Sequence, residues 1–289
     1  MNTLKKMYNP NKKAIDEHEF IALIHHHLTE NTPSGIKIRD KFSLDLPTEP
    51  LFKNTKMAGG TRSTHYDLQV VLPEENGTEP IKNVELKYSC KFKPIDISKQ
   101  PWIDCVQCYN GPGNKFSIGN KYAKKFYETC MDEIITHFDI KTPKPSFEEW
   151  AKDAFKQSKP STEFVKELRE VGYKSTYLSN MRKTFNKQFI ATTEDLMCLF
   201  VEAQKIIDLV FSSKDYWLQI HGDITEPDMF HVKWTNKINP PEIMSVEQEF
   251  SKNHSDINFK FICADDNVLY AKLRWGYGQC ITNIRIDIK

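Results

Sequence analysis

Two short apolar runs, at residues 68–72 and 84–86, are bordered by charged side chains in a pattern that predicts a pair of strands. Successive side chains of a strand point to opposite faces, so Glu85 and Lys87 are expected on one face and the apolar residues around them on the other. The connection between the runs is rich in Pro, Glu, Asn and Gly, which is typical of a hairpin loop. Antiparallel pairing would bring Asp67, which opens the first run, beside Glu85 and Lys87.

Apolar residues at helical spacing predict most of the helices. The expected helices cover residues 14–29, 102–109, 119–138, 146–157, 161–171 and 193–212. Residues 30–58 contain three prolines and a glycine, and they are expected to form a loop with short extended pieces. Residues 174–187 carry several basic side chains and fit either a polar segment between helices or a patch that faces DNA.

Residues typical of β-structure predict strands in the C-terminal part of the chain. These strands cover residues 216–221, 229–234, 259–264, 268–275 and 280–288. The last two flank Gly276-Tyr277-Gly278, which indicates a hairpin turn. Because two hairpin strands cannot bury a core alone, the first hairpin must join a larger sheet. The C-terminal strands either extend that sheet or form a separate β-rich module.

The residues of the first hairpin point to metal chemistry. Two carboxylates on one side of a hairpin repel each other and lose hydration unless a cation lies between them. Mg²⁺ suits them, because it is bound by one or two carboxylates while it keeps several waters. A lysine two residues from such a ligand could help to deprotonate the metal-bound water, orient it, or stabilise charge on a phosphate. A surface hairpin with an ion pair is the alternative interpretation.

The arrangement of Asp67 followed, after a short hairpin, by Glu85-Leu86-Lys87 resembles the PD-(D/E)xK nuclease superfamily, which includes many restriction endonucleases. In that family the Asp and the acid of E-x-K bind a divalent metal, and the Lys helps to activate water. The resemblance implies that Asp67 and Glu85 are metal ligands, that the Leu86 backbone carbonyl is a further ligand, and that Lys87 is catalytic. One position departs from the namesake pattern, because Tyr66 stands where the pattern has proline. The match covers about thirty residues.

The resemblance also implies a fold and an organisation. The fold class would be α/β (α+β mixed), with a restriction-endonuclease-like central mixed β-sheet flanked by helices, a helical insertion and a C-terminal β-hairpin. The nuclease core would cover residues 1–139, the helical region residues 140–213, and the β-rich part residues 214–289. Many members carry a further acid on the first helix that faces the metal, and Glu17 is the first choice for this role, with Glu19 second.

The implied activity is that of a Mg²⁺-dependent endonuclease, with Mn²⁺ as an alternative metal. It would hydrolyse phosphodiester bonds in double-stranded DNA, in a site-specific manner like type II restriction enzymes. A homodimer would follow if both strands of a palindrome are cut, because two-fold symmetric sites are matched by two-fold symmetric proteins. Two alternatives stay open: a nuclease of the same fold that acts on RNA or on repair and recombination intermediates, and a catalytically inactive nucleic-acid-binding protein.

Basic and polar residues on either side of the hairpin are candidates for contacts with nucleic acid. They are Arg62, Lys91, Lys93, Gln107, Lys115 and Lys121. Arginine binds phosphate through two parallel hydrogen bonds, which singles out Arg62 for the scissile phosphate. Solvated polar side chains are the alternative interpretation of the same residues.

Three other patterns fail a geometric test. Residues 25–27 are consecutive histidines, and consecutive helix residues point in different directions, so they cannot hold one ion together. Cys105 and Cys108 form a lone C-x-x-C without a second pair at zinc spacing. The glycines at 111 and 113 precede Lys115 without the spacing of a phosphate-binding loop, so no nucleotide cofactor is expected.

Composition narrows the setting of the protein. The chain has 289 residues and a formal net charge of +1, so any basic surface for DNA must be local. Seven cysteines at irregular spacing indicate reduced thiols in an intracellular protein. No apolar run approaches the length needed to span a membrane, and no targeting signal is evident. A cytoplasmic or nuclear location is therefore expected.

Overall fold

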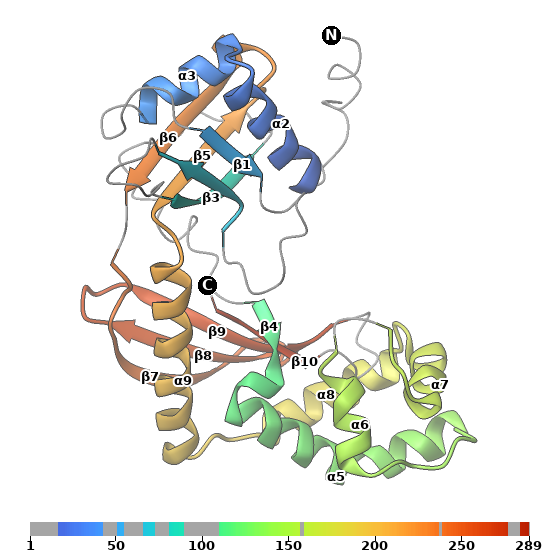
Figure 1. Ribbon diagram of the computed structural model, residues 1–289. Helices are drawn as coiled ribbons and strands as arrows, with labels where there is room; N and C mark the ends of the chain where they lie inside the picture. The colour runs from blue at the N-terminus through green and yellow to red at the C-terminus, as the bar shows by residue number, and fades with distance from the viewer. Residues whose placement is uncertain are drawn as a thin grey trace. The chain divides into compact units, whose positions relative to one another are not determined.

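Figure 1 shows the protein as a computed structural model, which describes eight stretches of the chain. These are residues 17–42, 51–54, 66–72, 81–89, 110–156, 159–236, 239–276 and 284–288. The chain forms two compact units, the first made of Met1–Val106 and Leu209–Pro240, and the second of Gln107–Asp208 and Pro241–Lys289. Each unit is assembled from two separate parts of the chain.

The first unit is built on a five-stranded mixed sheet with the order β1-β2-β3-β5-β6. Its strands are Leu51–Asn54 (β1), Leu68–Val71 (β2), Ile81–Ser89 (β3), Tyr216–Gly222 (β5) and Phe230–Asn236 (β6). Strand β1 pairs antiparallel with β2, and β2 pairs antiparallel with β3. Strand β5 runs parallel to β3, and β6 pairs antiparallel with β5. The predicted hairpin is confirmed, since Leu68 of β2 lies opposite Val84 of β3.

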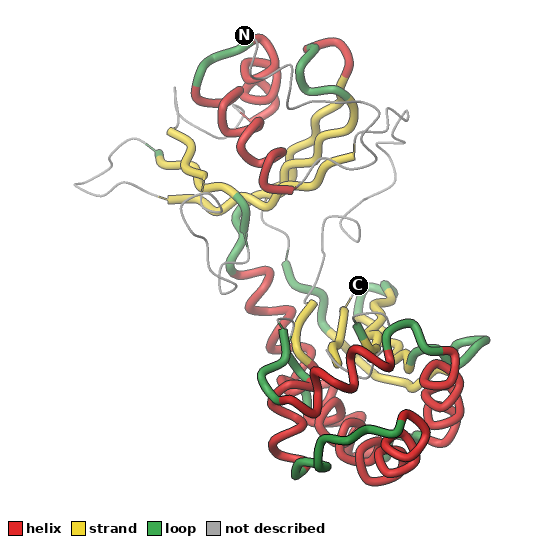
Figure 2. Tube along the Cα trace, turned by 90° about the vertical axis from the view of Figure 1, so that its right-hand side faces the viewer, coloured by secondary structure: helices red, strands yellow, loops and turns green. Residues whose placement is uncertain are grey.

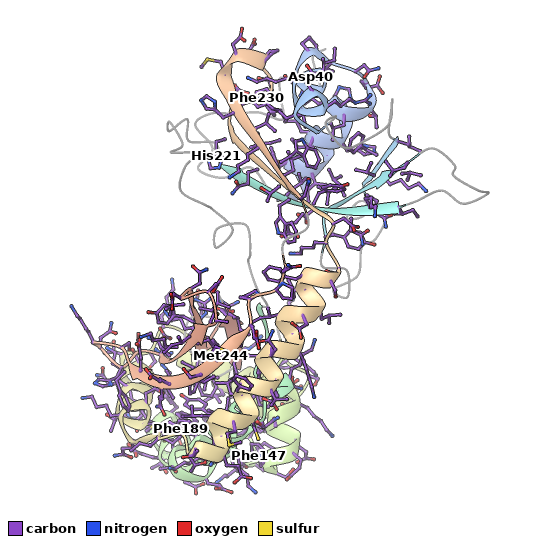
Figure 3. All side chains as sticks on the ribbon, turned by 90° about the vertical axis from the view of Figure 1, so that its left-hand side faces the viewer. Asp40, Phe147, Phe189, His221, Phe230 and Met244 are labelled. Atoms are coloured by element: carbon purple, nitrogen blue, oxygen red, sulfur yellow. The ribbon has the colours of Figure 1, made fainter. Side chains whose placement is uncertain are left out.

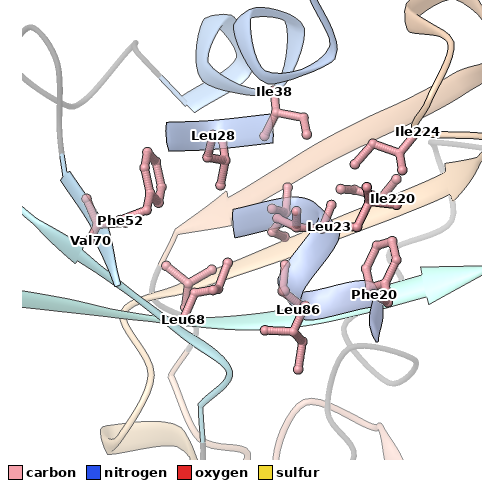
Figure 4. Packing of buried hydrophobic residues seen from close by; sticks show 14 of the residues in the cluster. Phe20, Leu23, Leu28, Ile38, Phe52, Leu68, Val70, Leu86, Ile220 and Ile224 are labelled. Atoms are coloured by element: carbon pink, nitrogen blue, oxygen red, sulfur yellow. The ribbon is translucent and has the colours of Figure 1, made fainter. Parts of the chain in front are cut away.

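Two helices, α2 (Glu17–Thr29) and α3 (Pro33–Phe42), lie on one side of this sheet (Figure 1, Figure 2). The core between helices and strands consists of apolar side chains that are almost fully buried (Figure 4). Its members include Phe20, Leu23, Ile24, Leu28, Leu68, Val70, Val84, Leu86, Leu218 and Ile220. Because every second strand residue faces the helices, the residues between them point to the opposite side of the sheet, which we call the far face.

Helix α3 corrects the loop expected after α2. The Thr32 hydroxyl accepts a hydrogen bond from the Gly35 backbone N–H at 3.1 Å, which caps the new helix. Pro33 is tolerated because it is the first helical residue, where no intrahelical N–H donor is needed. A Cβ at Gly35 would lie 1.8 Å from the His27 carbonyl oxygen, so the close contact between α2 and α3 requires glycine. The helix was missed because Pro and Gly, which usually indicate a loop, serve here as a start signal and a contact point.

The second unit contains an antiparallel sheet with the order β4-β10-β9-β8-β7. Its strands are Asn110–Pro112 (β4), Ile243–Phe250 (β7), Ile257–Cys263 (β8), Val268–Trp275 (β9) and Ile284–Ile288 (β10). Its helices are α5 (Ser117–Phe138), α6 (Phe147–Ala154), α7 (Glu163–Gly172), α8 (Thr176–Gln188) and α9 (Thr193–Ser212), the last turn of which belongs to the first unit. The expected antiparallel pairing of the last two strands is confirmed. Seven α-helices and two sheets among the described residues make the structure mixed α and β.

Two long elements of the second unit were not predicted, and neither was the three-residue strand β4. Helix α8 occupies most of the basic segment, where Leu178 and Phe185 are buried among polar residues and Ser175 caps the first turn. Strand β7 is the edge strand of its sheet, and most of its side chains are exposed or half-buried. Both lack a continuous apolar stripe, so their periodicity is too weak to reveal them.

A fully buried carboxylate, Asp153, joins the end of α6 to the start of α7. It accepts hydrogen bonds from the backbone N–H groups of Ser161 and Thr162 at 2.9 and 2.7 Å, and from Lys156 Nζ at 2.7 Å. Burial by itself would raise the pKa of Asp153, but these donors outweigh burial and hold the pKa well below its usual range. The carboxylate is therefore ionised and fully bonded in the folded protein.

We expect Asp153→Ala to lower the free energy of unfolding by about 3–5 kcal/mol, because the substitution leaves several buried donors without an acceptor. Urea unfolding measures the change. Asp132→Ala is the matched control, since the Asp132 side chain is 79% exposed and forms an ion pair with Lys144. Loss of this exposed ion pair should lower the free energy of unfolding by less than about 1 kcal/mol. Equal effects of the two substitutions would contradict the role of Asp153.

The burial of His27 is expected to make the first unit sensitive to acid. Its side chain is buried, with Nδ1 2.6 Å from the Thr32 hydroxyl oxygen. Burial lowers the pKa of His27 to about 4, and the neighbouring His26 adds to the effect. The unfolded chain binds this proton near pH 6.5, so protonation favours unfolding between these two values.

The free energy of unfolding should therefore fall as the pH is lowered from about 6.5 to about 4, by up to roughly 3 kcal/mol from His27 alone. His27→Gln should flatten this part of the stability profile. Urea unfolding at several pH values tests the expectation. His26→Gln, at a half-buried site, is the control and should flatten the profile much less, because burial lowers the pKa of His27 more than His26 does. An unchanged slope in the His27 variant would show that another group controls the acid sensitivity.

Candidate functional site

Asp67 lies where β2 begins, and its side chain completes the end of the β2–β3 ladder. Its backbone N–H donates to the Val84 carbonyl at 2.9 Å, and its Oδ2 accepts a hydrogen bond from the Leu86 backbone N–H at 2.7 Å. Asp67 is only 4% exposed. The hydrogen bond to Leu86 fixes the carboxylate beside the peptide group that follows Glu85, as the hairpin prediction required.

Glu85 points to the far face of the first sheet. Its neighbours Val84 and Leu86 are both in the core under the helices, so strand alternation turns Glu85 to the other side. The residue is 7% exposed, and it lies opposite Trp217 in the parallel β3–β5 pairing. Asp67 precedes the core residue Leu68 and reaches the same face. Two buried carboxylates therefore occupy neighbouring positions on one face.

A buried lysine, which the sequence did not reveal, accompanies these carboxylates. Lys214 is 2% exposed, and its Nζ lies 3.0 Å from Glu85 Oε2. The lysine follows α9 and comes just before β5, so it reaches Glu85 only because β5 lies beside β3. A buried ion pair of this kind compensates charges that would otherwise be strongly destabilising.

The segment that carries Lys214 is tied to β3 by several hydrogen bonds. Asp215 and Asn83 exchange two of them: the Asp215 N–H donates to the Asn83 carbonyl at 2.8 Å, and the Asn83 N–H donates to Asp215 Oδ2 at 2.8 Å. The Asn83 side-chain amide donates to the Ser213 carbonyl at 3.0 Å. These contacts hold the backbone on both sides of Lys214 and therefore set the position of its ammonium group.

The donor set fits a hard divalent cation. Asp67 and Glu85 supply carboxylate oxygens, and Mg²⁺ binds well to one or two carboxylates together with waters. The charges of these two groups and of Lys214 sum to one net negative charge, which leaves the cluster attractive to a further cation. Within the described ranges no group of three or more His, Cys, Asp or Glu residues gathers as a metal site, so waters and backbone oxygens would have to complete the coordination.

The remaining predicted site residues are distributed over the chain. Lys87 lies in β3 opposite Gln219 of β5, and Glu17 is the first residue of α2; the side chains of both lie outside the described part of the structure. Leu86 has its side chain in the core. The predicted contacts outside the described residues are Arg62, Lys91, Lys93 and Gln107.

Two predicted DNA contacts belong to the second unit. Lys115 is an exposed residue of the 3-10 turn that precedes α5. Lys121, on α5, forms an ion pair with Asp195 of α9 at 2.6 Å. Part of the positive charge of Lys121 is therefore compensated within its own unit. The site residues on β2 and β3 belong to the first unit.

The histidines of α2 have separate structural roles. His25 Nε2 lies 2.8 Å from the Phe52 carbonyl oxygen, whereas His27 Nδ1 contacts Thr32. Their side chains thus reach different partners. This agrees with the expectation that they do not hold one ion together.

Lys214→Met should lower the free energy of unfolding by about 3–5 kcal/mol, because it leaves Glu85 buried without its cation. Lys82→Met is the matched control, since Lys82 is 39% exposed and its Nζ lies 3.8 Å from Asp215; it should change the free energy by less than about 1 kcal/mol. The double variant Glu85→Leu, Lys214→Met should recover much of the loss. A single variant as stable as the control would contradict the role of this ion pair.

No helix in the described part of the chain is long and apolar enough to cross a membrane. Comparisons of the chain with models of protein families, with curated proteins and with solved structures found no match. The buried charges of Asp67, Glu85 and Lys214 are therefore the main indication of what this protein does.

Proposed function

We propose that the protein is a divalent-metal-dependent endonuclease that hydrolyses phosphodiester bonds in double-stranded DNA. In this proposal Asp67 and Glu85 bind the metal, which is Mg²⁺ or Mn²⁺, and Lys87 is the catalytic lysine. The observation that carries the proposal is the pair of buried carboxylates on one side of the β2–β3 hairpin. Two buried acids in neighbouring positions carry more negative charge than Lys214 alone compensates, so their presence favours a metal site over a surface hairpin.

The residues of the chain have distinct tasks in this mechanism. A bound Mg²⁺ would supply Lewis-acid chemistry at the phosphate and generate the nucleophile. The Leu86 N–H holds the Asp67 carboxylate in a fixed orientation, and Lys214 does the same for Glu85. Lys214 also cancels one negative charge, which limits the repulsion between the two acids and the phosphate. Lys87, two residues beyond Glu85 in β3, would orient the attacking water or receive its proton.

The fold of the first unit is compatible with the proposal. The hairpin is part of a mixed sheet that has helices on one side, in keeping with the restriction-endonuclease-like fold that the resemblance implies. The second unit provides a large additional surface outside the hairpin unit. This surface is available for target recognition, which favours site-specific cleavage, and a homodimer would then serve a palindromic target.

One observation favours a second candidate function. Lys214 already supplies a cation at 3.0 Å from Glu85, so the carboxylate is compensated without a metal. A nucleic-acid-binding protein that keeps the fold but does not cut would be compatible with this ion pair. The two functions differ in whether divalent metal produces cleavage.

The direct test incubates the purified protein with plasmid DNA and with single-stranded RNA, in the presence of Mg²⁺ or of EDTA. Discrete plasmid fragments that require Mg²⁺ are expected. A smear of DNA or loss of RNA would favour a nuclease with another substrate, and binding without cleavage would favour the second candidate.

Substitutions test the site itself. Asp67→Asn, Glu85→Gln and Lys87→Ala should each lower the cleavage rate by at least about 100-fold, while Lys87→Ala should still bind DNA. Lys82→Ala, on the same strand at a partly exposed position, should cut at the wild-type rate. Cleavage at the wild-type rate by both Asp67→Asn and Lys87→Ala would mean that the site is assigned wrongly.

A further inference from the structure

The far face of the first sheet continues beyond Glu85 onto β5 and β6. On β5, Leu218 and Ile220 are in the core under the helices, so the residues between and beside them face the other side. These far-face residues of β5 are Trp217, Gln219 and His221, and their partners on β6 are, in the same order, Thr235, Lys233 and His231. Figure 3 marks His221 near the end of β5.

Charge is separated along this face. The row that contains Asp67 and Glu85 is acidic. In the next row, Gln219 pairs with Lys87 on one side and with Lys233 on the other. In the row after that, His221 pairs with Ser89 and with His231. These two rows of β3, β5 and β6 contain basic and polar residues and no acid.

Lys233 is the most informative member of these rows. It is half-buried, and its side chain forms no ion pair with any residue that the structure describes. Lys37, on the helix-covered side of the same sheet, instead donates to the Phe230 carbonyl at 2.8 Å. A partly desolvated lysine without an acidic partner favours an anion as its ligand.

Accessibility increases from β5 to β6. Trp217 is 1% exposed and packs against Phe211 of the last turn of α9, with ring centroids 5.9 Å apart, and Gln219 is 5% exposed. On β6, His231 is exposed and Lys233 is half-buried. A ligand would therefore reach these rows from β6, which is the edge strand of the sheet.

We propose that His221, His231 and Lys233, which we call the basic strip, bind the sugar-phosphate backbone of the nucleic acid beside the bond that is cut. The inference rests on the proposed function, since it assigns a path for the substrate of that same site. Charge complementarity supports it, because the acidic row suits a metal ion and the adjoining rows suit phosphates.

The register gives the expected length of this path. The strip ends four residues along β3 and β5 from the row of Glu85, which is about 13 Å at roughly 3.3 Å per residue. At about 3.4 Å per nucleotide this distance corresponds to about four nucleotides on one side of the cut. The contacts are with phosphates, so they should be independent of base sequence.

The test measures binding of a fluorescently labelled DNA duplex by anisotropy at several salt concentrations, in EDTA so that cleavage is not needed. Lys233→Ala should raise the Kd several-fold and reduce the slope of log K against log salt by about 0.9, the value for one lost phosphate contact. Lys233→Arg should keep most of the wild-type slope. Lys41→Ala, at an exposed position of α3 on the opposite side of the sheet, is the matched control and should not change the slope.

The outcomes separate this inference from the proposed function. A reduced slope for Lys233→Ala in a protein that does not cut with Mg²⁺ would support the basic strip and reject the nuclease. A wild-type slope for Lys233→Ala in a protein that does cut would overturn the strip and leave the nuclease standing. Failure of the wild-type protein to bind DNA or RNA would overturn the strip. Circular dichroism and urea unfolding establish that each variant is folded.

Discussion

Each member of the buried ion pair between Lys214 and Glu85 depends on the other, and this constraint links β3 to β5 in the first unit. Glu85 faces away from the helices, so the core cannot shield it, and its charge needs a partner that the hairpin does not provide. That partner comes from a segment far away in sequence, immediately before β5. The parallel pairing of β3 with β5 and the ion pair of Glu85 with Lys214 therefore depend on each other, because Lys214 directly precedes β5.

Formation of this pairing requires a long excursion of the chain. Residues 107–208 of the second unit lie between the two strands in sequence, and closing so long a loop is entropically costly. The hydrogen bonds between Asp215 and Asn83 compensate part of this cost and fix the register at the entry of β5. The apolar residues of β5 then complete the core under α2 and α3. The same strand therefore contributes side chains both to the core and to the far face.

The far face combines two chemistries in a short distance. Asp67 and Glu85 form its acidic row, which suits a divalent cation, and the rows beyond them carry Lys233, His221 and His231. The proposed nuclease would use both properties next to each other, because it would hold a metal at the bond to be cut and bind phosphates on one side of it. The same sheet provides both because side chains of adjacent strands are aligned in rows.

The sequence by itself determined the features that depend on neighbours in the chain. The β2–β3 hairpin, the approach of Asp67 to Glu85 and the long helices α5 and α9 follow from alternation, turn residues and helical spacing, which are local. Tertiary structure decided the rest: the turn to helix at Pro33, the pairing of β3 with β5, and the contact of Lys214 with Glu85. The physical reason is that parallel pairing is set by burial on both faces of a strand and by partners more than a hundred residues away, and neither is recorded in the strand's own residues.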